Sequence, residues 1–228
     1  MATNSIPSSS SKYLGIIIDN KLNFKEHINF LVSKLAKLCG IVKYLKKYLK
    51  LSQLVYFYNV YIKPVIQYGV LIYGCTTRFS LLPLHKIQQK ILRSIFNRRK
   101  FESIANLMTD HGILNIFELH VYDCTKFALR SLRKEQPTEE LNDILKKSTH
   151  RYNTRQKELY RPPNYKTRSS KVSLAARCTK LINYILSNKI ADTEKLKQLL
   201  ITDEKTFLHQ FAVNHISQNE NLIHLIFR

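Results

Sequence analysis

The chain has 228 residues, of which 44% are hydrophobic, and its 37 Lys and Arg against 16 Asp and Glu give a formal net charge of +21. This hydrophobic content excludes wholesale disorder, because a chain of this length can bury the core of one or two domains. The charge predicts a polyanionic partner, nucleic acid first and an anionic membrane second, because an unneutralised excess of this size opposes compaction.

The first residues predict a disordered leader followed by a strand. Residues 1–11 are rich in serine and lack the apolar stretch of a signal peptide. Residues 12–22 contain the β-branched run Ile16–Ile18, which is typical of a buried strand, and then Asp19 and Asn20, which favour a turn. The downstream sequence offers no convincing partner strand. We therefore expect the chain to be the end of a larger protein, with this strand poorly protected from hydrogen exchange when the chain is alone.

Helical periodicity dominates residues 23–147. Apolar residues recur at three- and four-residue spacing over residues 24–38, and Gly40 is a suitable end for this first helix. A second helical piece is predicted over residues 41–49. Ser52 is a suitable N-cap for the helix that follows it.

Lysines without any accompanying acid mark the stretch from residue 34 to residue 50. A solvated helical face and a phosphate-contacting face can both carry such a run. An ordinary solvated face mixes Glu with Lys, so the absence of acids favours phosphate contact. The last four of these lysines are predicted to share one helical face. The predicted nucleic-acid-binding residues in this stretch are Lys34, Lys37, Lys43, Lys46, Lys47 and Lys50.

The most apolar tract covers residues 54–75 and predicts a buried helix pair. Its aromatic residues occur all round the first helix, which favours core packing over base stacking; they are Tyr56, Phe57, Tyr58 and Tyr61. Pro64 is expected to kink or restart the helix. A membrane span needs about 20 predominantly apolar residues, and polar residues interrupt this tract, so we expect no membrane span and, with nucleic acid preferred as the partner, no membrane.

Four more helices are predicted before residue 148. Ser80 is expected to cap the first, whose basic C-terminal end partly serves the helix macrodipole. A short helix follows over residues 101–111. Asn115 and Glu118 form a capping-box pattern that begins the third helix. Residues 137–147 predict an exposed helix with acids in its first turn and lysines in its last.

A basic, irregular segment is predicted over residues 148–180. Between Arg151 and Lys180 there are nine basic residues and one acid, a net charge of +8, and Pro162-Pro163 excludes a helix through the middle. Tyrosines interleave with the cations, which favours binding of single-stranded nucleic acid; a flexible linker or a localisation signal is the alternative. The predicted contacts here are Arg151, Tyr152, Arg155, Arg161, Arg168 and Lys171. Helices are expected again over residues 181–228.

The cysteines and the remaining motifs point away from a catalytic site. Cys39, Cys75, Cys124 and Cys178 are far apart and form no CxxC pair, which favours buried thiols in a reduced intracellular compartment, nuclear or cytoplasmic. Nucleophile-elbow, phosphate-loop and zinc-protease patterns are absent from the sequence.

One stretch carries a family resemblance. Residues 12–28, KYLGIIIDNKLNFKEHI, are similar to the segment after the catalytic palm in reverse transcriptases of non-LTR (LINE-type, jockey-like) retrotransposons. The matching residues are Tyr13, Leu14, Gly15, Asp19, Leu22, Phe24, His27 and Ile28. Weaker matches continue in order as far as residue 190, among them Tyr68-Gly69 and residues 152–155. Tyr73 and Ile182 stand where the family usually has Trp.

The resemblance implies the C-terminal region of such an enzyme. The expected fold is mainly α: a multi-helix thumb-like bundle over residues 23–147, preceded by a short N-terminal β-strand remnant of the palm sheet (12–22) and followed by the irregular basic segment (148–180) and C-terminal helices. The implied partners are RNA and DNA, as template and primer, and the palm and fingers domains that lie outside this chain.

Catalysis is expected to reside in that palm, together with its Mg²⁺. Polymerisation needs two or three carboxylates that converge on paired metal ions, and this chain has no adjacent Asp-Asp pair. We therefore expect no catalytic residue, no cofactor and no primer extension by the chain alone. A different class of protein stays open: a stand-alone basic helical adaptor or a membrane-surface interaction protein.

Overall fold

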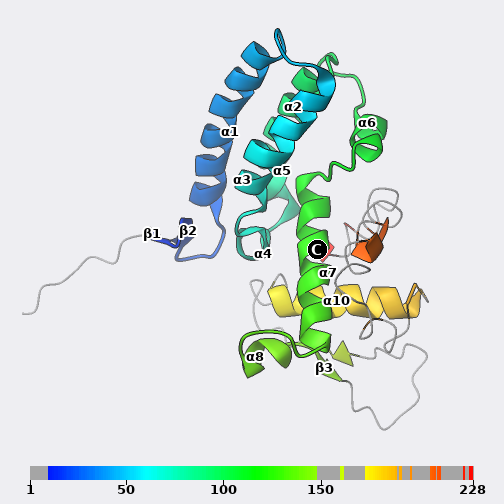
Figure 1. Cartoon of the computed structure of the whole chain (residues 1–228). Coiled ribbons are helices and arrows are strands. Elements are labelled where there is room, and N and C mark those ends of the chain that lie inside the picture. The colour runs from blue at the N-terminus through cyan, green and yellow to red at the C-terminus, as the bar shows by residue number, and fades with distance from the viewer. Residues whose placement is uncertain are drawn as a thin grey trace, which may run out of the picture. The chain divides into compact units, whose positions relative to one another are not determined.

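The computed structural model describes residues 10–147, 160–161 and 173–188, and beyond them residues 190, 191, 196, 206–208, 210, 211, 223, 226 and 227. It divides the chain into two compact units, Met1–His111 and Gly112–Arg228 (Figure 1). Helices make up most of the described part of both units, which confirms the prediction of a mainly α fold.

The first unit begins with a β-hairpin. Strand β1 (Ser10–Tyr13) pairs antiparallel with β2 (Ile16–Asp19), and Leu14 and Gly15 form the two-residue turn at φ of 45° and 83°. Positive φ at both positions matches the turn that best fits the twist of two adjacent strands. The prediction of a strand without a partner is wrong, because the partner precedes it and begins inside the expected leader. The strand was expected to be poorly protected from hydrogen exchange because it lacked a partner, and that reason no longer holds.

A close approach of backbone and side chain ties this hairpin to the helices behind it. Ile16 is buried, and its Cδ1 atom would lie 2.5 Å from a Cβ atom built on Gly69, which has a φ of 70°. The Tyr68 hydroxyl donates a 2.6 Å hydrogen bond to the Leu14 carbonyl. Gly69 is therefore required both for its conformation and for the space that Ile16 occupies.

Helix α1 (Lys25–Leu45) is a single helix, so the prediction of two pieces divided at Gly40 is wrong. Glycine inside a helix costs roughly 1 kcal/mol relative to alanine. Burying one Leu or Ile side chain contributes about 1.5–3 kcal/mol, and α1 buries Ile28, Leu31 and Leu35 among others. The apolar face therefore outweighs the glycine, and the helix continues to Leu45.

Four short helices follow: α2 (Leu51–Phe57), the π-helix η1 (Tyr58–Ile62), α3 (Lys63–Gln67) and α4 (Val70–Tyr73). Ser52 lies inside the first turn of α2 and does not cap it as predicted; the Lys50 N–H donates to Gln53 Oε1 at 3.0 Å. Pro64 cannot donate to the carbonyl of residue 60 and its ring would clash there, which explains the wider turn just before α3.

The aromatic residues of this region do not all lie in the core. Tyr58 is fully buried and its hydroxyl accepts a 2.8 Å hydrogen bond from Gln88 Nε2. Tyr56 and Tyr61 are 70% and 57% exposed, so the prediction that the whole aromatic set is buried is wrong. Tyr73 is fully buried, and its hydroxyl donates to the Ile66 carbonyl, so a smaller ring fills the place of the family's Trp.

Helix α5 (Arg78–Ile95) packs along α1, and α6 (Ala105–Asp110) follows it. The apolar residues that recur at three- and four-residue spacing on α5 are buried; they include Leu84, Ile91 and Leu92. The N-cap is Thr77, whose hydroxyl accepts the Ser80 N–H at 3.3 Å, and not Ser80 itself. Figure 1 shows α1, α2 and α5 side by side within this unit.

In the second unit, α7 (Ile116–Leu132) packs against α10 (Leu174–Ser187). The predicted capping box of Asn115 and Glu118 is confirmed. The predicted helix over residues 137–147 is wrong: α8 (Glu139–Asn142) is one turn, and β3 (Lys146–Lys147) pairs with β4 (Tyr160–Arg161).

Helix α10 begins earlier than expected, inside the segment predicted to be irregular. Ser173 caps it by accepting the Ala176 N–H, so residues 174–180 are helical. The rest of that segment, apart from β4, lies outside the described residues, as do most residues after 191 in the stretch 181–228 where helices are expected.

Candidate nucleic-acid interface

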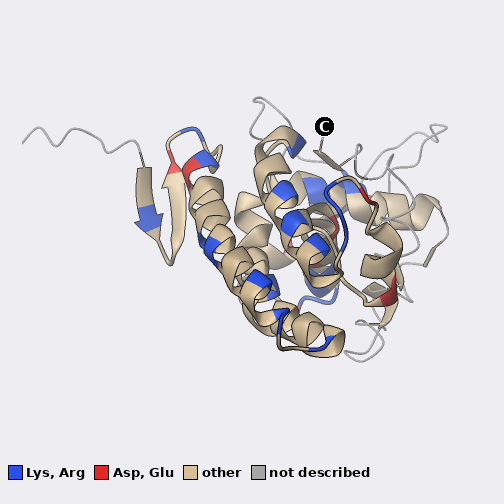
Figure 2. Ribbon diagram, turned by 90° about the horizontal axis from the view of Figure 1, so that it is seen from above, with Lys and Arg blue, Asp and Glu red and all other residues tan. Residues whose placement is uncertain are grey.

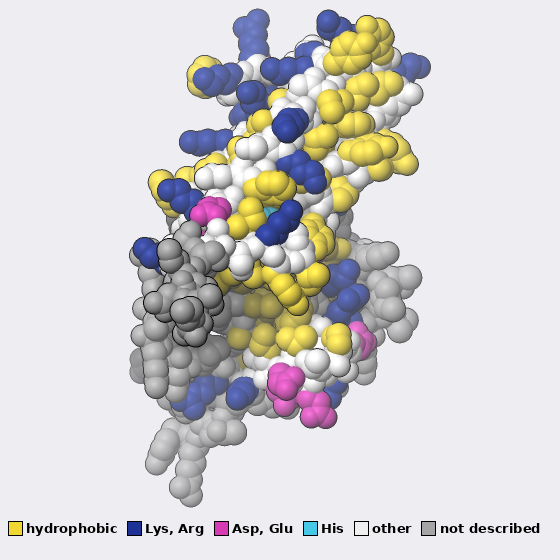
Figure 3. Space-filling model, turned by 90° about the vertical axis from the view of Figure 1, so that its left-hand side faces the viewer, with side chains coloured by type: hydrophobic (Ala, Val, Ile, Leu, Met, Phe, Trp, Pro, Cys, Tyr) yellow, Lys and Arg dark blue, Asp and Glu magenta, His cyan; other side chains and the backbone are white. Residues whose placement is uncertain are grey.

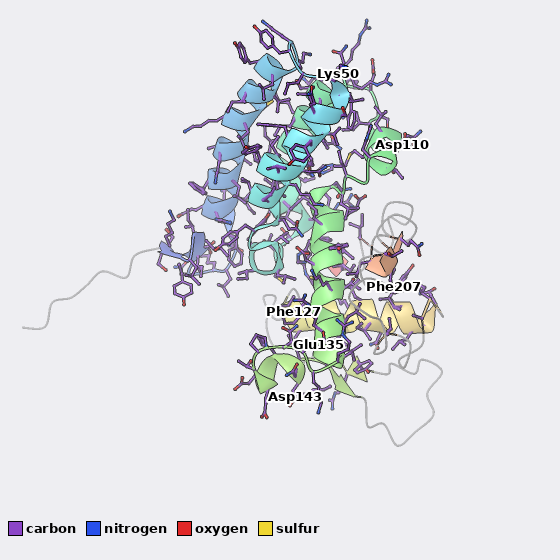
Figure 4. The ribbon with its side chains drawn as sticks, viewed as in Figure 1. Lys50, Asp110, Phe127, Glu135, Asp143 and Phe207 are labelled. Atoms are coloured by element: carbon purple, nitrogen blue, oxygen red, sulfur yellow. The ribbon has the colours of Figure 1, made fainter. Side chains whose placement is uncertain are left out.

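All six predicted lysines of residues 34–50 are exposed. Lys34 and Lys37 lie in the middle of α1, and Lys43 lies in its last turn. The remaining three lie at the end of α1 and in the turn to α2, so the prediction that four of them share one helical face is wrong. They share instead the end of the unit at which α1 passes into α2, where Figure 3 shows Lys and Arg gathered and where Figure 4 labels Lys50.

The end of α5 joins this group. Lys46 Nζ donates to Asn97 Oδ1 at 3.4 Å, which brings the C-terminal ends of α1 and α5 together. The residues after Asn97 are basic and exposed. The basic end, as we define it, consists of Lys43, Lys46, Lys47, Lys50, Arg98, Arg99 and Lys100. The sequence showed two separate basic runs, and the structure places them at one site.

Helix dipoles account for only part of this charge. Seven cations face one carboxylate, that of Glu102, which lies 3.7 Å from Arg98 Nη1 at the surface. The two helix C-termini contribute about half a negative elementary charge each, and exposed ion pairs contribute little, ~0–1 kcal/mol. About five positive charges therefore stay uncompensated at the basic end.

A sequence signal for this site extends well beyond residues 34–50. There is no Asp or Glu between Glu26 and Glu102, a run of 75 residues that includes 14 Lys and Arg. Figure 2 shows the result on the ribbon: basic positions recur along the helices, and the acidic positions are few. A count of acids over a longer window would have indicated that the two basic runs belong to one surface.

Exposed aromatic rings lie within the basic end and were not predicted as part of it. Tyr44 and Tyr48 are 61% and 69% exposed, and their ring centroids are 5.3 Å apart. Phe30 and Ile41, 43% and 46% exposed, precede them on α1. The spacing of these residues could have indicated a shared exposed face. Together with Lys34 and Lys37 they recur every three or four positions along the chain, away from the buried face of α1.

In the second unit the structure changes the interpretation of the basic segment. Arg161 is exposed on β4, opposite Lys146 of β3. Tyr160 is buried, and its backbone N–H and C=O bond the Asn183 amide at 3.1 and 2.8 Å, so it is no stacking platform as the sequence suggested. The other predicted contacts, Arg151, Tyr152, Arg155, Arg168 and Lys171, lie outside the described residues.

Arg177, one of the nine basic residues counted there, is fully buried. Its Nη1 atom lies 2.7 Å from His120 Nε2, and its guanidinium lies 4.5 Å from the ring centroid of Phe227. Such a residue cannot reach a phosphate. It belongs to the packing between α7 and α10.

Among the residues that the structure describes, burial shifts the pKa of three titratable groups. It lowers the pKa of His27, and it lowers the pKa of His85 to about 4, with Arg78 and Arg93 adding to the effect. Burial also raises the pKa of the Cys124 thiol, which keeps it protonated. Cys75 is half-buried, whereas the other three cysteines are buried as predicted.

Two further properties concern only the part of the chain that the structure describes. Among these residues, three or more His, Cys, Asp or Glu side chains do not gather anywhere as a possible metal site. Within the same residues, every helix is too short or too polar to cross a bilayer.

Comparison with curated proteins connects the chain to retrotransposons. It is 32% identical over 88 residues to the RNA-directed DNA polymerase from mobile element jockey of Drosophila funebris. The match covers 37% of this chain and 10% of that relative. It supports a relationship to the RNA-directed DNA polymerases of non-LTR retrotransposons. Neither a protein-family model nor a solved structure matches the chain.

Proposed function

We propose that this chain is the part of a non-LTR retrotransposon RNA-directed DNA polymerase that follows the palm, and that it binds the template–primer and the RNA of the element. The jockey relative supports the class of protein. The observation that carries the binding function is the basic end, where two helix termini bring seven cations together against one carboxylate.

The proposed mechanism is positioning by backbone electrostatics. Lys and Arg that neutralise phosphates release condensed counterions, which supplies affinity without base identity. The guanidinium groups of Arg98 and Arg99 can in addition form paired hydrogen bonds with phosphate oxygens. Bond formation is assigned to the palm of the whole enzyme with its Mg²⁺, and no catalytic role is proposed for a residue of this chain.

The salt dependence of RNA binding tests this function. The slope of log K against log salt is about −0.7 per neutralised phosphate of a single strand. The triple variant Lys43→Gln, Lys47→Gln and Lys50→Gln should therefore make the slope shallower by about two. The matched control replaces three cations of the second unit that lie away from β4, Lys126, Arg130 and Lys134, with Gln. Equal weakening by both variants, measured by fluorescence anisotropy, would show that bulk charge rather than a site binds RNA.

The same titration tests the predicted contacts of the basic segment. Replacing Arg151, Arg155, Arg161 and Arg168 with Ala should also reduce the slope, with the helical content in circular dichroism unchanged. The adaptor or membrane-surface alternative makes the opposite prediction. It requires little affinity for RNA at near-physiological salt together with binding to vesicles that contain anionic lipid, and that pair of results would refute the proposal.

A further inference from the structure

The exposed tyrosines of the basic end have no evident role in folding. Tyr44 lies beside Lys43 in the last turn of α1, and Tyr48 lies beside Lys47 in the turn to α2. Both rings are more than half exposed, and they meet at a tilt of 54° rather than stacking face to face. The outermost turn of this unit thus presents open aromatic faces between cations.

We infer that the basic end binds an unpaired nucleic-acid strand, with bases stacked on Tyr44 and Tyr48 and phosphates held by the neighbouring lysines. Every base has an aromatic face, so stacking on tyrosine works for any sequence. Lys43 and Lys47 supply the charge that the adjoining phosphates require. This inference rests on the proposed function and adds the form of nucleic acid that the site prefers.

The preference follows from which surfaces a nucleic acid exposes. In a duplex the base faces are covered by neighbouring base pairs, and a protein meets mainly phosphates, sugars and the base edges in the grooves. The cations of the basic end can contact the phosphates of either form. The two tyrosines contribute only when bases are free of their stack, so they raise affinity for a single strand and leave affinity for a duplex unchanged.

A second exposed aromatic face on the same unit provides the matched control. Tyr56 and Tyr61 are exposed to a similar degree, at 70% and 57%. The only charged residue in residues 51–74 is Lys63. Aromatic rings without phosphate partners should not hold a polyanion, so these two residues separate the effect of lost rings from the effect of a lost site.

The experiment measures binding of the full chain to a 2-aminopurine-labelled RNA, single-stranded and as a blunt duplex. The variant Tyr44→Leu/Tyr48→Leu should lose about tenfold or more in single-strand affinity, because stacking contributes about that factor per base. Duplex affinity should stay within about twofold, the salt slope should be unchanged because no charge is removed, and the fluorescence change on binding should disappear. The control Tyr56→Leu/Tyr61→Leu should bind like the wild type. Tyr44→Phe/Tyr48→Phe keeps the rings and should restore binding.

Each other outcome counts against the inference. Equal losses on single strand and duplex, or an unchanged affinity in the Tyr44/Tyr48 variant, would refute the stacking role while the lysine variants could still support the proposed function. A loss that Phe does not restore would indicate a structural role for the hydroxyls. If neither the lysine nor the tyrosine variants affect RNA binding but both weaken binding to anionic vesicles, the basic end faces a lipid surface and the proposed function fails as well.

Discussion

The two units differ in the side chains that they expose and in the polar side chains that they bury. Residues 1–111 contain 17 Lys and Arg against 4 Asp and Glu, whereas residues 112–228 contain 20 against 12. Among the described residues, every exposed large hydrophobic side chain belongs to the first unit. Both units bury polar side chains, but among the described residues the second buries more of them, and Arg177 is the one Lys or Arg that is buried. The first unit thus has the unusual surface, and the second has the unusual interior.

This contrast separates binding from folding. Exposed rings and uncompensated cations cost stability or contribute nothing to it, so the surface of the first unit indicates a partner. A buried, hydrogen-bonded arginine stabilises only its own surroundings. Changes in the interior of one unit should therefore leave the other unit folded, and amide exchange of α5 and of α7 reports on the two separately.

The largest expected effect comes from Arg177→Ala. The substitution leaves a cavity at Phe227 and removes one hydrogen-bond partner of His120, and large-to-small changes in cores cost roughly 2–5 kcal/mol. Exchange of α7 and α10 should accelerate accordingly while α5 is unaffected. The exposed Arg130→Ala on α7 is the control, with a change within about 0.5 kcal/mol. Unchanged exchange in α7 would show that the buried arginine is dispensable.

A smaller effect, confined to the first unit, is expected from Gly69→Ala. A φ of 70° is strained for alanine, at about 1–2 kcal/mol, and the new Cβ would overlap Ile16. Ile16→Val removes the overlapping Cδ1 atom and should restore part of the loss in the double variant. Gly40→Ala is the matched control and should stabilise by about 1 kcal/mol, because a Cβ added at residue 40 would have no atom within 4 Å. Urea unfolding measures all three; a destabilising Gly40→Ala would contradict an uninterrupted helix α1.

The last expected effect appears only when the pH falls below 6.5. His85 has a folded pKa of about 4 against an ordinary value of 6.5, so the unfolded state binds the proton first as the pH falls. Stability is fully present above pH 6.5 and is lost towards pH 4 by at most ~1.4 kcal/mol per pH unit. His85→Gln should flatten this slope in the first unit, with the residual slope from His27, whose pKa is lowered in the same direction. An equal slope in the variant and the wild type would exclude His85 as its source.

Local features were predictable where all the participants lie close together in sequence. The capping box of Asn115 and Glu118 needs two residues three positions apart, and the inward face of α5 needs only a periodic pattern. The hairpin was missed because its turn uses Leu14 where Asn is preferred, and because the sequence of β1, SSKY, has little strand character. The sequence predicts that the first helix ends at Gly40, but α1 continues to Leu45 because the burial of its apolar face outweighs the cost of one glycine.

The candidate site was predictable in its charge and not in its shape. The lysines of residues 34–50 stand out from the missing acids alone. That Arg98–Lys100 join them depends on the packing of α1 against α5, and that Arg177 is buried depends on His120, 57 residues away in sequence. Tyr44 and Tyr48 escaped notice because aromatic residues on a helix normally indicate core.

The π-helix η1 sets the rotational phase of α3, the helix that continues directly from it. Leu54, Tyr58, Ile62 and Ile66 are all buried, at steps of four residues. In an α-helix each such step overshoots a full turn by about 40°, so three steps would carry Ile66 roughly 120° round the axis. The wider π turn takes up an extra residue and cancels part of this drift. The length of residues 58–62 therefore fixes which face of α3 is buried: deletion of one residue there would rotate Ile66 out of the core.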